Sequence, residues 1–132
     1  MSFGNTFEND LLALIFNGTA IGNIADNAGT SPLTNLYVSL HTADPGEAGT
    51  QETSEATYTS YARQAVARSG SGWTVTANSV SPASDIGFPE VTGGTETITH
   101  VAIGTAETGA GKVLAYGALS ASIAISSGTI PS

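Results

Sequence analysis

Two histidines, His41 and His100, are the side chains of this sequence best suited to acid–base chemistry or metal binding. Together with Asp44 they could hold zinc, and with a serine they could form a hydrolase triad. Neither histidine lies in a spaced metal-binding motif, and the sequence contains no nucleophile elbow. Both fall in expected strands opposite apolar neighbours, which favours a surface or subunit-contact role. We therefore predict neither a metal site nor a catalytic triad.

Pairs of carboxylates are the second arrangement that could do chemistry. Glu52 with Glu55, or Glu90 with Glu96, could act as the acid and base of a glycosidase. The chain has eleven Asp and Glu residues, so accidental pairs are common. Glu52 and Glu55 also lie in an expected loop that has no aromatic platform for a sugar ring. The carboxylates therefore do not predict catalysis.

A glycine-rich segment that ends in a lysine, residues 109–112, superficially resembles a phosphate-binding loop. That motif requires glycine where Ala106 stands and serine or threonine where Val113 stands. The segment also lies between two expected strands, where no helix N-terminus can hold a phosphate. We predict a hairpin turn there, no cofactor, and no enzymatic activity.

Three aromatic residues and two arginines are candidates for contacts with other molecules. Tyr58, Tyr61 and Trp73 could stack against a carbohydrate, but core packing is the favoured interpretation. Arg63 and Arg68 are five residues apart and point to opposite faces of a straight strand. We expect one arginine to pair with loop carboxylates and the other to meet a partner.

The composition limits the classes of function. The chain has 132 residues, enough for one domain with its own core, and no cysteine for a disulfide or a thiolate metal site. Charged residues make up only 11%, while serine and threonine number 33 and glycine 16, a composition typical of β-rich folds. The net charge of −8 argues against direct binding to nucleic acid or to an anionic membrane.

No apolar run is long enough for a transmembrane helix. Residues 11–16 have the character of a signal-peptide core, but the run is too short and follows Glu8 and Asp10 instead of a positive region. We expect an unprocessed chain that is made in the host cytoplasm.

Residues 5–17 are predicted to form one amphipathic helix. A polar residue at its start, Asn5 or Thr6, can cap it, and Gly18 can end it. Its apolar residues recur at helical spacing: Phe7, Leu11, Leu14 and Ile15. A loop or arm rich in glycine and asparagine follows. The pattern predicts a helix and arm over residues 1–35 and a separate domain over residues 36–132.

The rest of the chain is predicted to form short strands separated by turns. Residues 36–43 alternate, so the apolar ones should face a core and the polar ones, Ser39 and His41 among them, should face outward. Residues 46–57 are expected to form a long exposed loop. Further strands are expected at 62–68, 73–77, 96–106, 112–119 and 121–126, and at 80–88, where Pro82 should break the strand. This spacing predicts an all-β fold, an antiparallel, jelly-roll-like β-sandwich with one short N-terminal helix.

Several segments resemble a known family. The clearest are LHTADPGEAGT at 40–50 and YARQAV at 61–66, followed by FP at 88–89, THVAIG at 99–104 and GAL at 117–119. They are similar to small virion proteins of tailed bacteriophages. Members are often labelled tail-fibre proteins, and some look like trimeric capsid cement proteins with a β-sandwich fold. Relatives often carry a further apolar strand after residues 126–128, so an edge strand is either missing here or completed by a neighbouring subunit.

The resemblance, which covers about residues 5–126, implies a capsid cement or decoration protein without catalytic residues. Such a protein is a homotrimer on the outer surface of the virion's shell that binds the major capsid protein. Because it binds only the assembled shell, it stabilises that shell by mass action. The residues expected to contact the capsid or another subunit are Phe7, Leu11, Leu14, Ile15, Arg63 and Arg68. The opposing interpretation, held equally, is that the helix only covers the core of the sandwich.

The alternative function is a tail-fibre or tailspike-type receptor-binding module. The loop over residues 44–57 and the aromatic residues Tyr58, Tyr61 and Trp73 would then contact glycans on the host surface.

Overall fold

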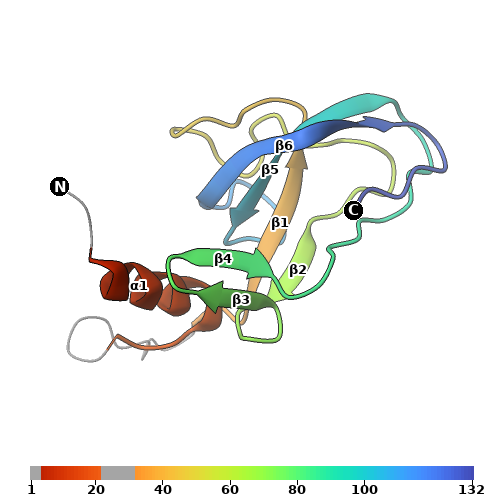
Figure 1. Cartoon of the computed structure of the whole chain (residues 1–132). Helices are drawn as coiled ribbons and strands as arrows, with labels where there is room; N and C mark the ends of the chain where they lie inside the picture. Colours follow the sequence, from red (N-terminus) through yellow and green to blue (C-terminus); the bar gives the residue numbers. More distant parts are fainter. Residues whose placement is uncertain (1–3, 22–31) are drawn as a thin grey trace. The chain divides into compact units, whose positions relative to one another are not determined.

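The computed structural model describes residues 4–21 and 32–132, and the chain divides into two compact units (Figure 1). One, called the helical unit below, comprises Met1–Leu36 and Val66–Asp85. The other, the sheet unit, comprises Tyr37–Ala65 and Ile86–Ser132. The predicted division at residue 35 stays a prediction, and residues 22–31 of the expected arm lie outside the described residues.

The helical unit contains α1 (Asn5–Asn17) and a hairpin of β3 (Trp73–Thr76) and β4 (Ser79–Pro82). The predicted helix is confirmed, but its N-cap is Gly4 instead of a polar side chain. Gly18 ends α1 in the left-handed conformation, with φ of 66°, which a residue with a side chain rarely adopts. Within the part of the chain that the structure describes, no helix is long and apolar enough to cross a bilayer.

The core of the helical unit is built on two aromatic rings. Phe16 and Trp73 are 4% and 2% exposed, and their centroids lie 5.0 Å apart in an edge-to-face arrangement. The predicted apolar stripe of the helix is only half-buried: Phe7, Leu11, Leu14 and Ile15. Phe16 was not part of that stripe, yet it is the buried residue of α1, because α1 packs against β3 and β4. Whether the stripe contacts a partner stays a prediction.

The larger sheet has four strands in the order β2-β1-β5-β6, where β1 spans Asn35–His41, β2 Gln64–Ala67, β5 Glu96–Gly104 and β6 Val113–Ile125. β1 with β5, and β5 with β6, pair antiparallel. The predicted antiparallel β fold with one N-terminal helix is therefore confirmed. The two expected C-terminal strands form one strand, β6, in which residues 119–122 bulge opposite Thr99 of β5. In the segment 80–88 the strand β4 ends at Pro82, the residue expected to break it, because proline lacks the N–H that would continue the ladder.

The predicted outward face of β1 is buried, which corrects the sequence interpretation. Ser39 and His41 are both 0% exposed. The segment expected to be an exposed loop covers them: the N–H of Thr42 donates to Ser54 at 2.8 Å, and the N–H of Ala56 donates to Leu40 at 2.8 Å. From Val38 to His41 both faces of β1 are therefore buried, as in the core of a layered fold, whereas Tyr37 is half-buried.

Candidate functional site

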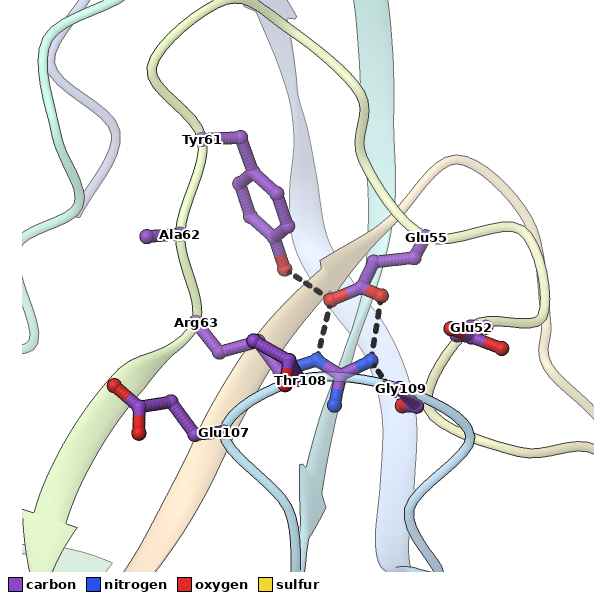
Figure 2. Close-up of a pocket in the computed structure, with 8 residues that line it drawn as sticks. All are labelled: Glu52, Glu55, Tyr61, Ala62, Arg63, Glu107, Thr108 and Gly109. Carbon is purple, nitrogen blue, oxygen red and sulfur yellow. Dashed lines mark hydrogen bonds and ion pairs between the residues drawn. The ribbon is translucent and has the colours of Figure 1, made fainter.

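The sheet unit contains a pocket of about 280 Å³ formed by two loops (Figure 2). One loop runs from the end of β1 to β2, and the other joins β5 to β6. The lining residues are Glu52, Glu55, Tyr61, Ala62, Arg63, Glu107, Thr108 and Gly109. A concave site with a few convergent polar groups is the standard place to look for a binding function.

A buried ion pair lies at the centre of this pocket (Figure 2). The guanidinium of Arg63 donates from Nε to Glu55 Oε1 at 2.6 Å and from Nη2 to Oε2 at 2.7 Å, a two-point contact. The side chains of Arg63 and Glu55 are 3% and 14% exposed. Such a geometry is among the strongest that a carboxylate can make. The hydrogen bonds that Arg63 donates to Glu55, together with the negative charge of that carboxylate, raise the pKa of Arg63.

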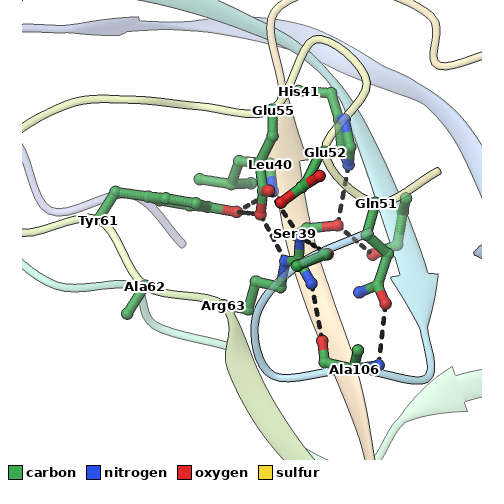
Figure 3. A network of polar contacts seen from close by, with 12 residues as sticks. Ser39, Leu40, His41, Gln51, Glu52, Glu55, Tyr61, Ala62, Arg63 and Ala106 are labelled. Carbon is green, nitrogen blue, oxygen red and sulfur yellow. Dashed lines mark hydrogen bonds and ion pairs between the residues drawn. The ribbon is translucent and has the colours of Figure 1, made fainter. Parts of the chain in front are cut away.

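Arg63 also joins the two loops of the pocket. It donates to the carbonyl oxygen of Ala106 at 2.9 Å (Figure 3) and to that of Gly109 at 2.8 Å (Figure 2). The expectation that one arginine pairs with a loop carboxylate is confirmed. The expectation that Arg63 meets the capsid or another subunit finds no support in this geometry, because its side chain is 3% exposed and is directed inward.

Tyr61 extends the same network. Its hydroxyl donates to Glu55 Oε1 at 2.9 Å and accepts the N–H of Leu40 at 3.1 Å. Burial raises the pKa of Tyr61 well above its ordinary value, and the nearby charge of Glu55 raises it further. The phenol therefore stays protonated and keeps its role as a donor. Its ring is stacked on Phe88, with centroids 6.4 Å apart.

Ser39 and His41 form a hydrogen-bonded pair that resembles part of a hydrolase triad (Figure 3). His41 Nδ1 lies 2.8 Å from the carbonyl oxygen of Thr53, which can only accept, so Nδ1 carries the proton. Nε2 of the neutral ring then accepts the Ser39 hydroxyl at 2.8 Å. Because both side chains are 0% exposed, a substrate cannot reach them, and the pair serves to hold the loop on β1.

The burial of His41 predicts a pH dependence of stability. Burial lowers the pKa of His41 below 6.5, although the Thr53 carbonyl and the charge of Glu55 oppose that shift. Below about pH 6.5 the unfolded chain therefore binds a proton that the folded chain resists, so stability is lost as the pH falls. We expect the urea midpoint to drop between about pH 7.5 and pH 5. The drop should shrink in His41→Gln and persist in His100→Gln; an equal drop in both variants would contradict this account.

Gln51 is a buried residue of the site that the sequence analysis missed. It is 0% exposed, and its Oε1 accepts the N–H of Ala106 at 2.9 Å (Figure 3). A Cβ at Gly104 would lie 2.1 Å from Gln51 Cδ, and one at Gly111 would lie 2.1 Å from Oε1. Glycine at these two positions therefore makes room for the glutamine. A lone glutamine in a polar loop carries no signal in the sequence that could have revealed this.

Arg68, the second predicted contact residue, binds the end of α1 within the helical unit. Its guanidinium donates from Nε to the carbonyl oxygen of Ile15 at 2.6 Å and from Nη2 to that of Leu14. These carbonyls belong to the last turn of the helix, where the backbone lacks its own donors and carries partial negative charge. The structure therefore places Arg68 in a capping role that the sequence analysis did not foresee.

Arg68→Ala is expected to lower the free energy of unfolding by about 1–3 kcal/mol, because it removes charged hydrogen bonds at a helix C-terminus. Far-UV circular dichroism during urea unfolding measures the loss. Arg68→Lys keeps the charge without the planar fork, so its loss should be intermediate. Equal stability of the alanine variant and the wild type would show that the cap contributes nothing.

The three aromatic residues considered for glycan contact are separated by the fold. Trp73 lies in the helical unit and is 2% exposed, whereas Tyr58 lies in the sheet unit and is 4% exposed. Neither ring offers a face on which a sugar could stack. Tyr61 is the partly exposed member, and it lines the pocket beside Arg63.

Among the described residues, no group of three or more acidic, histidine or cysteine side chains could hold a metal ion. The carboxylates that line the pocket therefore do not form a cation cage; Glu55 is committed to Arg63, while Glu52 and Glu107 are exposed at its rim.

The sequence was compared with known proteins and protein families, and one family matches it. No curated protein matches the sequence. Residues 2–132 match the family described as "Podophage GP4 fiber I protein gp80". The resemblance to tailed-phage virion proteins that are labelled as fibre proteins is thereby confirmed, whereas the family description names a fibre and not a capsid cement protein. The chain therefore belongs to the podophage GP4 fiber I protein family, a family of phage virion fibre proteins.

Proposed function

We propose that this protein is a structural subunit of a fibre on the phage particle. The observation that carries the proposal is the family match, which extends over residues 2–132. It favours the fibre over the capsid cement function that the sequence analysis preferred, because the matching family is described by its place in a fibre. The homotrimer and the contact with the major capsid protein belonged to the cement interpretation, and the match lends them no support.

Side-chain contacts hold the two pocket loops of the sheet unit in place, which supports a structural function. The two loops that form the pocket are held by side chains: Arg63 joins Glu55 to the carbonyls of Ala106 and Gly109, and Gln51 binds the backbone of Ala106. These buried hydrogen bonds restrict the two loops, although Gln51 Nε2 has no hydrogen-bond partner among the described residues.

Immunogold electron microscopy of purified virions tests the location. Antibodies raised against the 132-residue chain should label the fibres and leave the shell unlabelled. Gold spread evenly over the shell would refute the fibre proposal and restore the cement function. A virion that lacks the label altogether would refute both.

Contact with host surface glycans is a second proposed function of the same fibre subunit. The supporting observation is the pocket, where Tyr61 presents a partly exposed ring beside the exposed carboxylates of Glu52 and Glu107. Carboxylate oxygens accept hydrogen bonds from sugar hydroxyls, and an aromatic ring offers an apolar surface to the sugar's C–H groups. This proposal replaces the predicted aromatic trio, since Tyr58 and Trp73 are buried.

Binding of the purified chain to host cells tests the glycan contact. Glu107→Gln and Glu52→Gln keep the shape of the pocket and remove one charge each, so both should weaken binding. Glu47→Gln, at an exposed position outside the pocket, is the matched control and should bind as the wild type does. Wild-type binding by both pocket variants, or no binding by the wild type, would refute the glycan contact and leave the fibre proposal intact.

A further inference from the structure

The strand β6 has an unusual edge. With 13 residues it is the longest strand described, and it lies at one end of the strand order β2-β1-β5-β6 (Figure 1). Within the described part of the chain, β6 pairs only with β5, so its other edge presents backbone N–H and C=O groups without strand partners. Such an edge is a template for another strand.

This edge lacks three of the features by which proteins usually prevent pairing: charged side chains, proline and a short strand. Common protections are charged side chains, proline, short strands and bulges. Residues 113–125 contain no charged residue and no proline, although the bulge at 119–122 interrupts the strand. Residues 113–118 are paired with β5 on one side, with one further irregularity near Leu114. The opposite edge of these six residues is available to pair with another strand.

Apolar side chains are exposed on the same segment. Leu114 and Tyr116 are 38% and 39% exposed, two of the largest exposed hydrophobic residues described. Their neighbours Ala115, Gly117 and Ala118 are small, so another backbone can approach closely. Free backbone groups and exposed apolar side chains thus coincide on residues 113–118.

We propose that residues 113–118 of β6 form a contact between copies of this chain. The charge distribution favours this strand as the surface through which two copies meet. The chain carries a net charge of −8, and no charged residue follows Lys112. Two copies that meet along β6 bring uncharged strands together, whereas contacts through the acidic loops would bring carboxylates together at a cost in free energy. The inference goes beyond the proposed fibre role and does not depend on the chain's location in the virion.

Size-exclusion chromatography with light scattering on the full chain tests this proposal. The wild type should elute with a mass that is a multiple of 13.2 kDa, and that multiple gives the number of copies. Tyr116→Glu and Leu114→Glu place like charges at the contact and should shift the mass to that of a single chain. Thr97→Glu, at an exposed position of the neighbouring strand β5, is the control and should keep the wild-type mass.

Circular dichroism must show that the variants retain the wild-type fold, since both changed side chains are exposed. A monomeric wild type at every concentration would overturn the proposal. So would folded Tyr116→Glu and Leu114→Glu variants with the wild-type mass, because the copies would then associate through another surface. Amide hydrogen exchange adds a second readout: protection at residues 113–118 should rise with protein concentration.

Discussion

Replacing Arg63 by alanine is expected to lower the free energy of unfolding by about 3–5 kcal/mol, because it leaves the carboxylate of Glu55 without its buried partner. The same change removes the donors to the carbonyls of Ala106 and Gly109, so both loops lose a connection. Most small domains are stable by only about 5–15 kcal/mol, so the variant will be close to unfolding. Urea unfolding followed by circular dichroism measures the difference.

Lys112→Ala is the matched control for this change. Lys112 is an exposed cation in the same unit, and its loss should have little effect on the urea midpoint. Replacing both members of the pair, with Arg63→Met and Glu55→Leu together, should recover part of the loss, because no buried charge is then left unpaired. If Arg63→Ala unfolds at the same urea concentration as Lys112→Ala, the ion pair does not stabilise the fold.

The second large effect is expected at Trp73. Trp73→Ala should cost about 3–5 kcal/mol, the usual range when a buried large aromatic side chain is truncated. The ring is 2% exposed and packs edge-to-face on Phe16, so its removal leaves a cavity in the core of the helical unit. Because Trp73 is the only tryptophan, the unfolding of this variant must be followed by circular dichroism, not by tryptophan fluorescence.

The variant Trp73→Phe separates the contribution of ring packing to stability from the effect of the buried indole N–H. Among the described residues, Trp73 Nε1 is buried without a hydrogen-bond partner, so phenylalanine removes an unsatisfied donor while it keeps an aromatic ring. The loss of stability should be clearly smaller than for alanine. Near-wild-type stability of Trp73→Ala would contradict the packing described above. Any loss of host binding by that variant must first be attributed to unfolding, because the ring cannot reach a ligand.

Local signals predicted the elements of the fold. The spacing of apolar residues and Gly18 located α1, and the alternation in residues 36–43 located β1. The same alternation gave a wrong burial pattern for Ser39 and His41. A polar residue on a buried face has the same appearance in a sequence as one on an exposed face, because the partners that satisfy it, such as the Thr53 carbonyl, are defined only in the folded chain.

The candidate site was predictable in part. A pairing of one arginine with a loop carboxylate was expected, and Arg63 with Glu55 fulfils it over a separation of eight residues. The carbonyls of Ala106 and Gly109 lie 43 and 46 residues away, so the second half of the arginine's contacts depends on how β5 and β6 bring their connecting loop to the pocket. Every residue has a backbone carbonyl, so the sequence does not show which carbonyls accept a side-chain hydrogen bond. For the same reason the role of Arg68 at the end of α1 could not be inferred.

The copy number of this protein per virion is the most direct test of its place in a fibre. Quantitative mass spectrometry of purified particles, with the major shell protein as the internal reference, measures it. A fibre subunit should be present in far fewer copies than the shell protein, in a fixed number per particle. Copies comparable in number to the shell protein would contradict the fibre function and indicate a capsid cement protein instead.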